Sequence, residues 1–174
     1  MNNNNYNVIS IVDSLVNITS HTEKNVLEKS LLIALNELIP TTSIRLFKVQ
    51  KSAGNHEISL LAFSANGVVS DELSRAFAAI GQHGGIESIP NAENSAWQII
   101  YPTFDINNDI FLILVQRCEK PTAEDQQTVH GIFKVYANHL ALIEKTQRDK
   151  LTGLFNRETL DDEITKILVN DCDD

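Results

Sequence analysis

Few side chains in this chain of 174 residues are of a type and spacing that could do chemistry. Its five histidines are His21, His56, His83, His130 and His139. They lack the spacing of zinc ligands, and the last two lie nine positions apart, so they point in different directions on one helix. Arg45 is more informative, because it lies in an otherwise apolar run and a buried guanidinium needs an anionic partner. We predict no metal site, and the partner of Arg45 is either a ligand or a carboxylate of the chain.

The possible nucleophiles are equally sparse. The two cysteines, Cys118 and Cys172, lie far apart, and the second belongs to an acidic tail. This pattern is typical of free thiols in a reducing cytoplasm rather than of a disulfide framework. No serine, histidine and aspartate arrangement and no phosphate-binding loop is present. The sequence therefore predicts a cytoplasmic protein with no catalytic residue of its own.

Composition excludes two classes of partner. The formal charge is −9, whereas a nucleic-acid-binding surface needs clustered lysine and arginine. No apolar run approaches the roughly 18 residues that a membrane-spanning helix requires. The hydrophobic content of 43% is ordinary for a globular protein. We expect neither nucleic acid nor membrane as a partner.

The spacing of apolar residues predicts the elements. Residues 6–39 are predicted to form two helices, because apolar side chains recur every three or four positions until Pro40 ends the pattern. Two hairpins follow, with strands at Ser43–Gln50, Glu57–Ala65, Ala96–Phe104 and Asp109–Arg117.

Between and after the hairpins we predict two more helices. The first covers Ser70–Gln82, and a short edge strand follows it at Gly85–Pro90. The second begins at the N-cap Thr122 and continues to about Thr152.

This order of elements resembles that of GAF domains, which are α+β sensor modules. The resemblance covers residues 5–146 and rests on the order and length of the elements. PAS domains are the alternative, although they usually lack the leading helix pair. We therefore predict an α+β fold with a GAF-like central antiparallel sheet, helices on its faces and a long C-terminal signalling helix, with residues 1–146 as the sensory domain.

The resemblance implies a ligand pocket between the sheet and the segment Asn66–Ser95. We name Arg45, His83, Trp97 and Tyr101 as candidates for its lining. Trp97 and Tyr101 are also residues of the kind found at the edge of a core. The signature of cyclic-nucleotide-binding GAF domains is missing, so the resemblance implies at most an unidentified small molecule.

The long helix carries a regular apolar pattern. Its members alternate at four and three positions: Val129, Phe133, Tyr136, Leu140 and Ile143. This spacing is typical of the seam of a coiled coil. Over residues 125–137, packing of the helix on its own domain explains the pattern equally well. Beyond Asn138 we predict that the helix leaves the globule and forms the seam of a parallel homodimer.

A sharper motif follows that helix. Asp149–Arg157, DKLTGLFNR, resembles the D-x-L-T-G-L-x-N-R entry sequence of GGDEF domains, the catalytic domains of diguanylate cyclases. All seven fixed positions match. The resemblance implies that residues 147–174 are the end of the signalling helix and the cut-off start of a GGDEF domain. The magnesium, GTP and catalytic residues of that family would then belong to the missing part.

The same resemblance implies roles for the residues of the junction. Asp149 and Arg157 would form an ion pair across a wide turn, and Thr152 would cap the helix that follows. The candidate junction residues are Asp149, Leu151, Thr152, Leu154, Asn156 and Arg157, with both leucines buried.

These resemblances imply the regulatory, dimerising sensor region of a bacterial-type diguanylate cyclase, which would control cyclic di-GMP synthesis by the downstream domain. The competing hypothesis is a ligand-free dimerisation or protein-interaction module attached to a GGDEF domain. A third hypothesis, that the chain is itself a cyclase, is opposed by the absence of the Gly-Gly-Asp-Glu-Phe loop.

Overall fold

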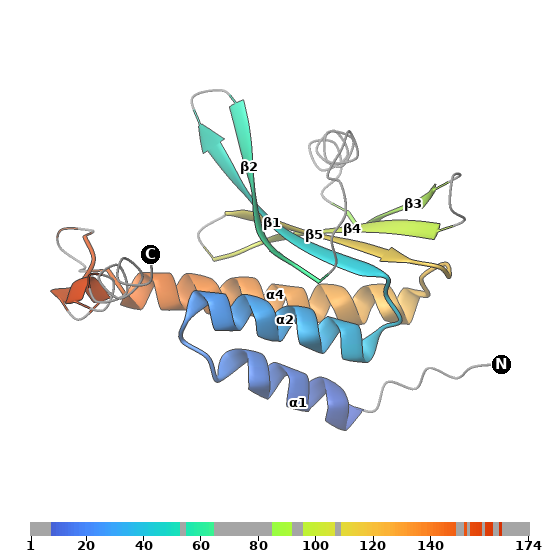
Figure 1. The fold of residues 1–174 in the computed structure, drawn as a ribbon, viewed down its shortest axis with the longest axis horizontal. Coiled ribbons are helices and arrows are strands. Elements are labelled where there is room, and N and C mark those ends of the chain that lie inside the picture. The colour runs from blue at the N-terminus through green and yellow to red at the C-terminus, as the bar shows by residue number, and fades with distance from the viewer. Residues whose placement is uncertain are drawn as a thin grey trace, which may run out of the picture.

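The computed structural model describes residues 8–52, 55–64, 85–91, 96–106 and 109–148, and beyond them residues 152, 154–157, 159–161 and 164 (Figure 1). Its helices are α1 (Val8–Thr19), α2 (Lys24–Leu38) and α4 (Ala123–Thr146). Its strands are β1 (Ser43–Ser52), β2 (Asn55–Phe63), β3 (Glu87–Asn91), β4 (Ala96–Phe104) and β5 (Ile110–Arg117). The predicted helix at Ser70–Gln82 lies outside the described residues.

The strands form one antiparallel sheet in the order β2-β1-β5-β4-β3. The two predicted hairpins are its β1–β2 and β4–β5 pairs, and the short strand predicted before Pro90 pairs with β4 as an edge. β5 lies in the centre, and its nearly continuous apolar sequence is buried along most of its length. A strand covered on both faces has no polar alternation, which explains this pattern.

The described helices lie on one face of the sheet (Figure 1). α2 and α4 run side by side against it, and α1 packs on both of them from the outside. The main core lies between helices and sheet and includes Leu31 and Leu35 of α2 and Phe111 and Ile113 of β5. Burying each side chain of this size contributes about 1.5–3 kcal/mol, so this layer supplies most of the stability.

A second, smaller cluster lies on the opposite face of the sheet. It consists of Phe47, Val49, Ile100, Leu112 and Leu114. Neighbouring residues of β5 therefore belong to different clusters, because successive side chains of a strand point to opposite faces. The α+β architecture with a central antiparallel sheet agrees with the prediction.

The long helix ends earlier than predicted. α4 stops at Thr146, and the amide of its C-cap Gln147 donates the last helical hydrogen bond, to the Ile143 carbonyl at 3.0 Å. The next residue, Arg148, forms an isolated antiparallel bridge with Phe155. The chain therefore turns back at 147 instead of continuing to residue 152. None of the helices within the described ranges is long and apolar enough to cross a lipid bilayer.

Candidate ligand and transmission sites

The four predicted pocket residues do not form one site. Arg45 pairs with Leu114 and lies on the face of the smaller cluster. Tyr101 is part of the main core on the helix-covered face, and Trp97 packs against that core. His83 lies outside the described residues. The grouping of Trp97 and Tyr101 with Arg45 was therefore wrong, because strand periodicity alone does not tell which parity of β4 faces the same side as Arg45.

Tyr101 is a core residue rather than a ligand platform. Its side chain is buried, and burial raises the pKa of its hydroxyl, while the charge of Arg117 lowers it and that of Asp125 raises it. Trp97 is half-buried, with the Lys120 Nζ 5.5 Å from the centre of its ring. Both aromatic residues border the beginning of α4.

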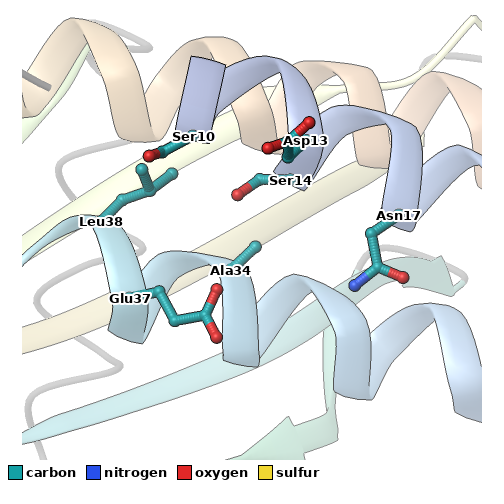
Figure 2. Close-up of a pocket in the computed structure, with 7 residues that line it drawn as sticks. All are labelled: Ser10, Asp13, Ser14, Asn17, Ala34, Glu37 and Leu38. Atoms are coloured by element: carbon teal, nitrogen blue, oxygen red, sulfur yellow. The ribbon is translucent and has the colours of Figure 1, made fainter. Parts of the chain in front are cut away.

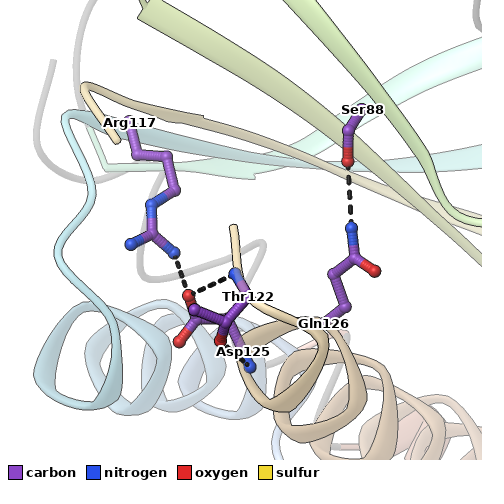
Figure 3. Close-up of polar contacts among 5 residues, drawn as sticks. All are labelled: Ser88, Arg117, Thr122, Asp125 and Gln126. Carbon is purple, nitrogen blue, oxygen red and sulfur yellow. Dashed lines mark hydrogen bonds and ion pairs between the residues drawn. The ribbon is translucent and has the colours of Figure 1, made fainter. Parts of the chain in front are cut away.

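A buried ion pair anchors that beginning (Figure 3). The Arg117 guanidinium donates to Asp125 Oδ2 at 2.7 Å, with side chains only 3% and 1% exposed. The same carboxylate accepts from the Thr122 amide at 3.0 Å, and Thr122 Oγ1 accepts from the Asp125 amide at 3.0 Å. This reciprocal capping box satisfies two donors at the helix start, and it confirms Thr122 as the N-cap.

The same end of α4 is tied to the sheet edge. Gln126 Nε2 donates to Ser88 Oγ of β3 at 3.0 Å (Figure 3). Arg45 was predicted to be a buried guanidinium with an anionic partner, whereas Arg117, which was not predicted, is a buried guanidinium whose partner is Asp125. The signal that could have found it is the spacing Thr122-x-x-Asp125 immediately after β5, which brings a carboxylate back to the strand end.

The predicted dimer seam is corrected by burial. Within this single chain the exposed fractions are 0% for three of its members, 1% for Leu140 and 7% for Ile143. The three fully covered residues are Val129, Phe133 and Tyr136. The two aromatic rings form a core contact, with Tyr136 stacked on Phe133 and edge-on to Phe111 of β5. α4 packs on its own domain up to its last turn, so these residues have no side chain to offer a partner.

The turn after α4 is held by Asn156. Its Nδ2 donates to the Thr146 carbonyl at 3.0 Å, and its amide donates to the Gln147 carbonyl at 2.9 Å. Its Oδ1 accepts from the Thr159 amide at 2.8 Å, which is the N-cap contact of the helical residues that follow. The prediction that Thr152 caps this helix was wrong, because Asn156 occupies the position three residues before that amide. Thr152 Oγ1 instead accepts from the Leu154 amide at 3.4 Å.

Other junction predictions have mixed outcomes. Leu154 is 68% exposed, contrary to its predicted burial, because none of the described elements packs over it. The Arg157 guanidinium is exposed, with its Nε 3.9 Å from Asp161 Oδ2. Asp149 and Leu151 lie outside the described residues, so the predicted pair of Asp149 with Arg157 stays a prediction.

A cavity of about 500 Å³ lies at this end of the domain, and we call it the junction cavity. It is bounded by the start of α2, by β1 and β2, by the end of α4 and by the turn that follows. Its charged lining residues are Lys24, Lys48, Asp109, Glu144 and Arg148. Its apolar lining residues are Leu61, Leu140, Ile143 and Phe155.

Lys48 is the centre of the charges in this cavity. Its Nζ lies 2.8 Å from Asp109 Oδ2, 3.9 Å from Glu144 Oε1 and 5.2 Å from the centre of the Phe111 ring. The Lys48 side chain is only 11% exposed, whereas those of Asp109 and Glu144 are 44% and 33% exposed. Lys48 therefore links the sheet to the last turn of α4 from a shielded position.

A second hollow, of about 420 Å³, lies in the groove between α1 and α2 (Figure 2). Its lining includes Asp13 and Asn17 of α1 and Glu37 of α2, all of which are exposed. Exposed charges contribute little to binding because they interact in a medium of high dielectric and are screened by salt, so we assign this groove no ligand. Within the described part of the chain no group of three or more histidine, cysteine, aspartate or glutamate side chains is placed to hold a metal ion.

Solved structures identify the fold. The chain is similar to the GAF domain of a candidate sensor histidine kinase from Pseudomonas syringae pv. tomato, with a TM-score of 0.58, 11% identity, and coverage of 80% of this chain and 88% of that one. It is also similar to a GAF domain/HD domain protein from Geobacter sulfurreducens, with a TM-score of 0.57, 9% identity, and coverage of 75% and 98%. A bacteriophytochrome from R. palustris matches with a TM-score of 0.64 and 9% identity over 82% of this chain and 39% of that one.

The chain therefore has the fold of GAF domains, as its order of elements predicted. No protein-family model matches the sequence, and no curated protein matches it. At these identities the likeness concerns the fold alone.

Proposed function

We propose that this chain is the sensory, regulatory region of a diguanylate cyclase and controls cyclic di-GMP synthesis by a GGDEF domain that follows it. The observation that carries this proposal is the DKLTGLFNR motif at residues 149–157, directly after a GAF-like fold. Magnesium and GTP would be bound by the downstream domain, and residues 1–174 would have no cyclase activity of their own.

The geometry of the turn supports a transmitting role. Asn156 is bonded to the carbonyls of Thr146 and Gln147, so the motif is fixed to the last residues of α4. Arg148 also stacks on Phe155, with 5.2 Å between its guanidinium carbon and the ring centre. A displacement of the end of α4 would therefore move the start of the next domain with it.

Dimerisation remains part of the proposal, on a different surface. The outward side of α1 exposes Val8, Ile9, Val12 and Val16, which are between 49% and 72% accessible. These side chains carry no charge, so a second copy of the same surface meets them without opposing like charges, in a chain whose formal charge is −9. α1 and α4 run in the same direction (Figure 1), so a parallel pair through α1 would bring both junctions to one end.

The test uses the natural, longer protein with GTP and magnesium. We expect cyclic di-GMP to form, and we expect deletion of residues 1–146 to change its rate. Asp149→Ala should change the rate or its regulation while the melting temperature of residues 1–174 stays constant, because a pair formed with the exposed Arg157 would contribute only about 0–1 kcal/mol.

Two outcomes would contradict the proposal. A longer protein that forms no cyclic di-GMP would remove the cyclase assignment. A cyclase whose rate is the same with and without residues 1–146 would leave this region as a ligand-free dimerisation or interaction module. For that alternative, Val12→Glu should turn a dimer into a monomer in light scattering.

A further inference from the structure

We propose that the junction cavity binds a small organic carboxylate with an apolar body, and that this ligand regulates the turn after α4. The proposal rests on the sensory function above and names the place and chemistry of sensing. The cavity volume of about 500 Å³ falls within the roughly 300–1,000 Å³ usual for ligand sites.

The walls come from two parts of the chain that signalling must connect. Lys48, Ser59 and Leu61 belong to the sheet of the domain, whereas Arg148 and Phe155 belong to the turn after α4. A molecule in the cavity would touch both groups at once. Its binding energy would therefore depend directly on how the turn is seated against the sheet.

A bulge in the sheet shapes one wall. The pairing of β1 with β2 passes from Leu46 with Ala62 to Phe47 with Leu60, so Leu61 is an extra residue without a partner in β1. Bulges re-aim side chains, and Leu61 lines the cavity. Together with Leu140, Ile143 and Phe155 it gives the cavity an apolar part that would accept a hydrocarbon group.

The charges of the lining favour an anion. Three cationic side chains, those of Lys24, Lys48 and Arg148, line the cavity beside the carboxylates of Asp109 and Glu144, and Lys24 also lies 4.0 Å from Glu28 Oε1. Lys48 is the most shielded donor, and an ammonium has three hydrogens to donate. Water competes less for a shielded charge, so Lys48 would bond an incoming carboxylate more strongly than a surface lysine would.

Competition at Lys48 supplies the regulation. Asp109 lies 2.8 Å from Nζ, whereas Glu144 lies at 3.9 Å, beyond hydrogen-bonding distance. A bound carboxylate would replace the weaker contact, that of Glu144. Glu144 is in the last turn of α4, so its release would loosen the helix end at the point where Asn156 holds the turn.

Binding is tested on residues 1–174 by calorimetry and by ¹H–¹⁵N NMR titration. The probes are hexanoate, benzoate, phenylacetate and L-phenylalanine. Hexanamide and benzamide serve as neutral matches, and acetate serves as an anion without an apolar body. We expect saturable binding of at least one of the four acids, about ten-fold tighter than its amide, the value of one charge-assisted hydrogen bond. It should also bind more tightly than acetate, which has the charge but no apolar body to bury.

Four variants locate that binding. Lys48→Met removes the shielded donor and should weaken binding about ten-fold or more. Ser59→Phe fills the cavity from the edge strand β2 without altering a charge, and it should abolish binding. Leu60→Phe on the same strand and Glu37→Gln in the α1–α2 groove are the matched controls, and both should bind as the original chain does. Leu60 is 44% exposed and pairs with Phe47, outside the cavity.

Absence of saturable binding by all four acids at millimolar concentration overturns the proposal. So does binding that survives both Lys48→Met and Ser59→Phe, because the acid then occupies another place. If Lys48→Met fails to fold, the comparison of Ser59→Phe with Leu60→Phe still shows whether the acid binds in the junction cavity.

The longer protein separates this proposal from the proposed function. Acid binding in a protein that forms no cyclic di-GMP would keep the cavity and remove the cyclase assignment. Cyclic di-GMP synthesis at a rate that no probe acid changes would keep the cyclase and overturn the regulatory part of this proposal.

Discussion

The two ends of α4 are attached to the sheet in opposite ways. At its beginning, Arg117 and Asp125 form an ion pair that is almost completely buried and is locked by the capping box with Thr122. At its end, Lys48 reaches the half-exposed Glu144 across 3.9 Å, beside a cavity of about 500 Å³. The first attachment is short and buried, although Arg117 Nε has no hydrogen-bond partner among the described residues, and the second is long and partly exposed.

The difference shows where α4 can move. Breaking a buried pair leaves an uncompensated charge in a medium of low dielectric, so the beginning of the helix is fixed as long as the domain is folded. A half-exposed contact costs little to exchange for water or a ligand. The C-terminal end of α4 is therefore its adjustable end. It is also the end that carries the junction turn, as a transmitting helix requires.

The largest effect should come from breaking the fixed end. Asp125→Ala removes the partner of the buried Arg117 and the capping-box bond that the Thr122 amide donates to the Asp125 carboxylate, so we expect a loss of about 3–5 kcal/mol in the free energy of unfolding. Urea denaturation measures it, with Glu124→Ala, an exposed acid in the same turn, as the control. A loss below about 1 kcal/mol would show that the two ends are attached with similar strength.

The next effect tests whether the last turns of α4 belong to the core. Leu140→Ala should cost about 2–5 kcal/mol, because the Leu140 side chain is 1% exposed. Leu142→Ala, at a position 51% exposed, should change stability by less than about 0.5 kcal/mol. The opposite result would be a dimeric original chain and a stable, monomeric Leu140→Ala variant in light scattering. That result would support the predicted dimer seam through Leu140 and contradict its place in the core.

A pH-dependent effect should follow at the adjustable end. Glu28 of α2 is 6% exposed, and its Oε1 has no hydrogen-bond partner among the described residues. Burial raises its pKa above the ordinary value of 4.5, and nearby Lys24 lowers it in part. The folded chain then holds this proton to a higher pH than the unfolded chain, so stability is lost as pH rises from 4.5 through the folded pKa.

Glu28→Gln should remove that loss. Its melting temperature should exceed that of the original chain near pH 7 and approach it near pH 4, where the carboxyl is protonated in both states. Glu23→Gln, an exposed position just before the same helix, is the control. Equal melting temperatures for Glu28→Gln and the original chain near pH 7 would contradict the prediction.

The smallest effect should come from the long contact itself. Glu144→Gln should change the free energy of unfolding by only about 0–1 kcal/mol, and added salt should reduce the difference further. A loss as large as that of Asp125→Ala would mean that the end of α4 is fixed like its beginning.

Much of the fold could be predicted from the sequence, because its signals are local. The unbroken apolar run of β5 indicated a central strand, and Thr122 before two acids indicated the start of α4. The exact end of α4 could not be predicted in the same way. It depends on Asn156, ten residues further on, whose side chain bonds the Thr146 carbonyl.

The candidate sites were harder to predict, since they depend on which face a residue occupies. Arg45 and Tyr101 both lie on strands, and only the register of β1 and β4 against β5 places them on opposite faces. The junction cavity had no sequence signal, because Lys48, Asp109 and Glu144 come from separate elements.

The sequence by itself determined the elements, their order and therefore the fold class, because helix and strand periods are set by the backbone. It also determined the DKLTGLFNR motif and its place directly after the long helix that became α4. Only the tertiary structure decided what the apolar stripe of α4 faces. A 4-3 spacing is satisfied equally by a sheet of the same chain and by a second helix. In this chain α4 packs against its own sheet, so the apolar stripe is part of the domain core.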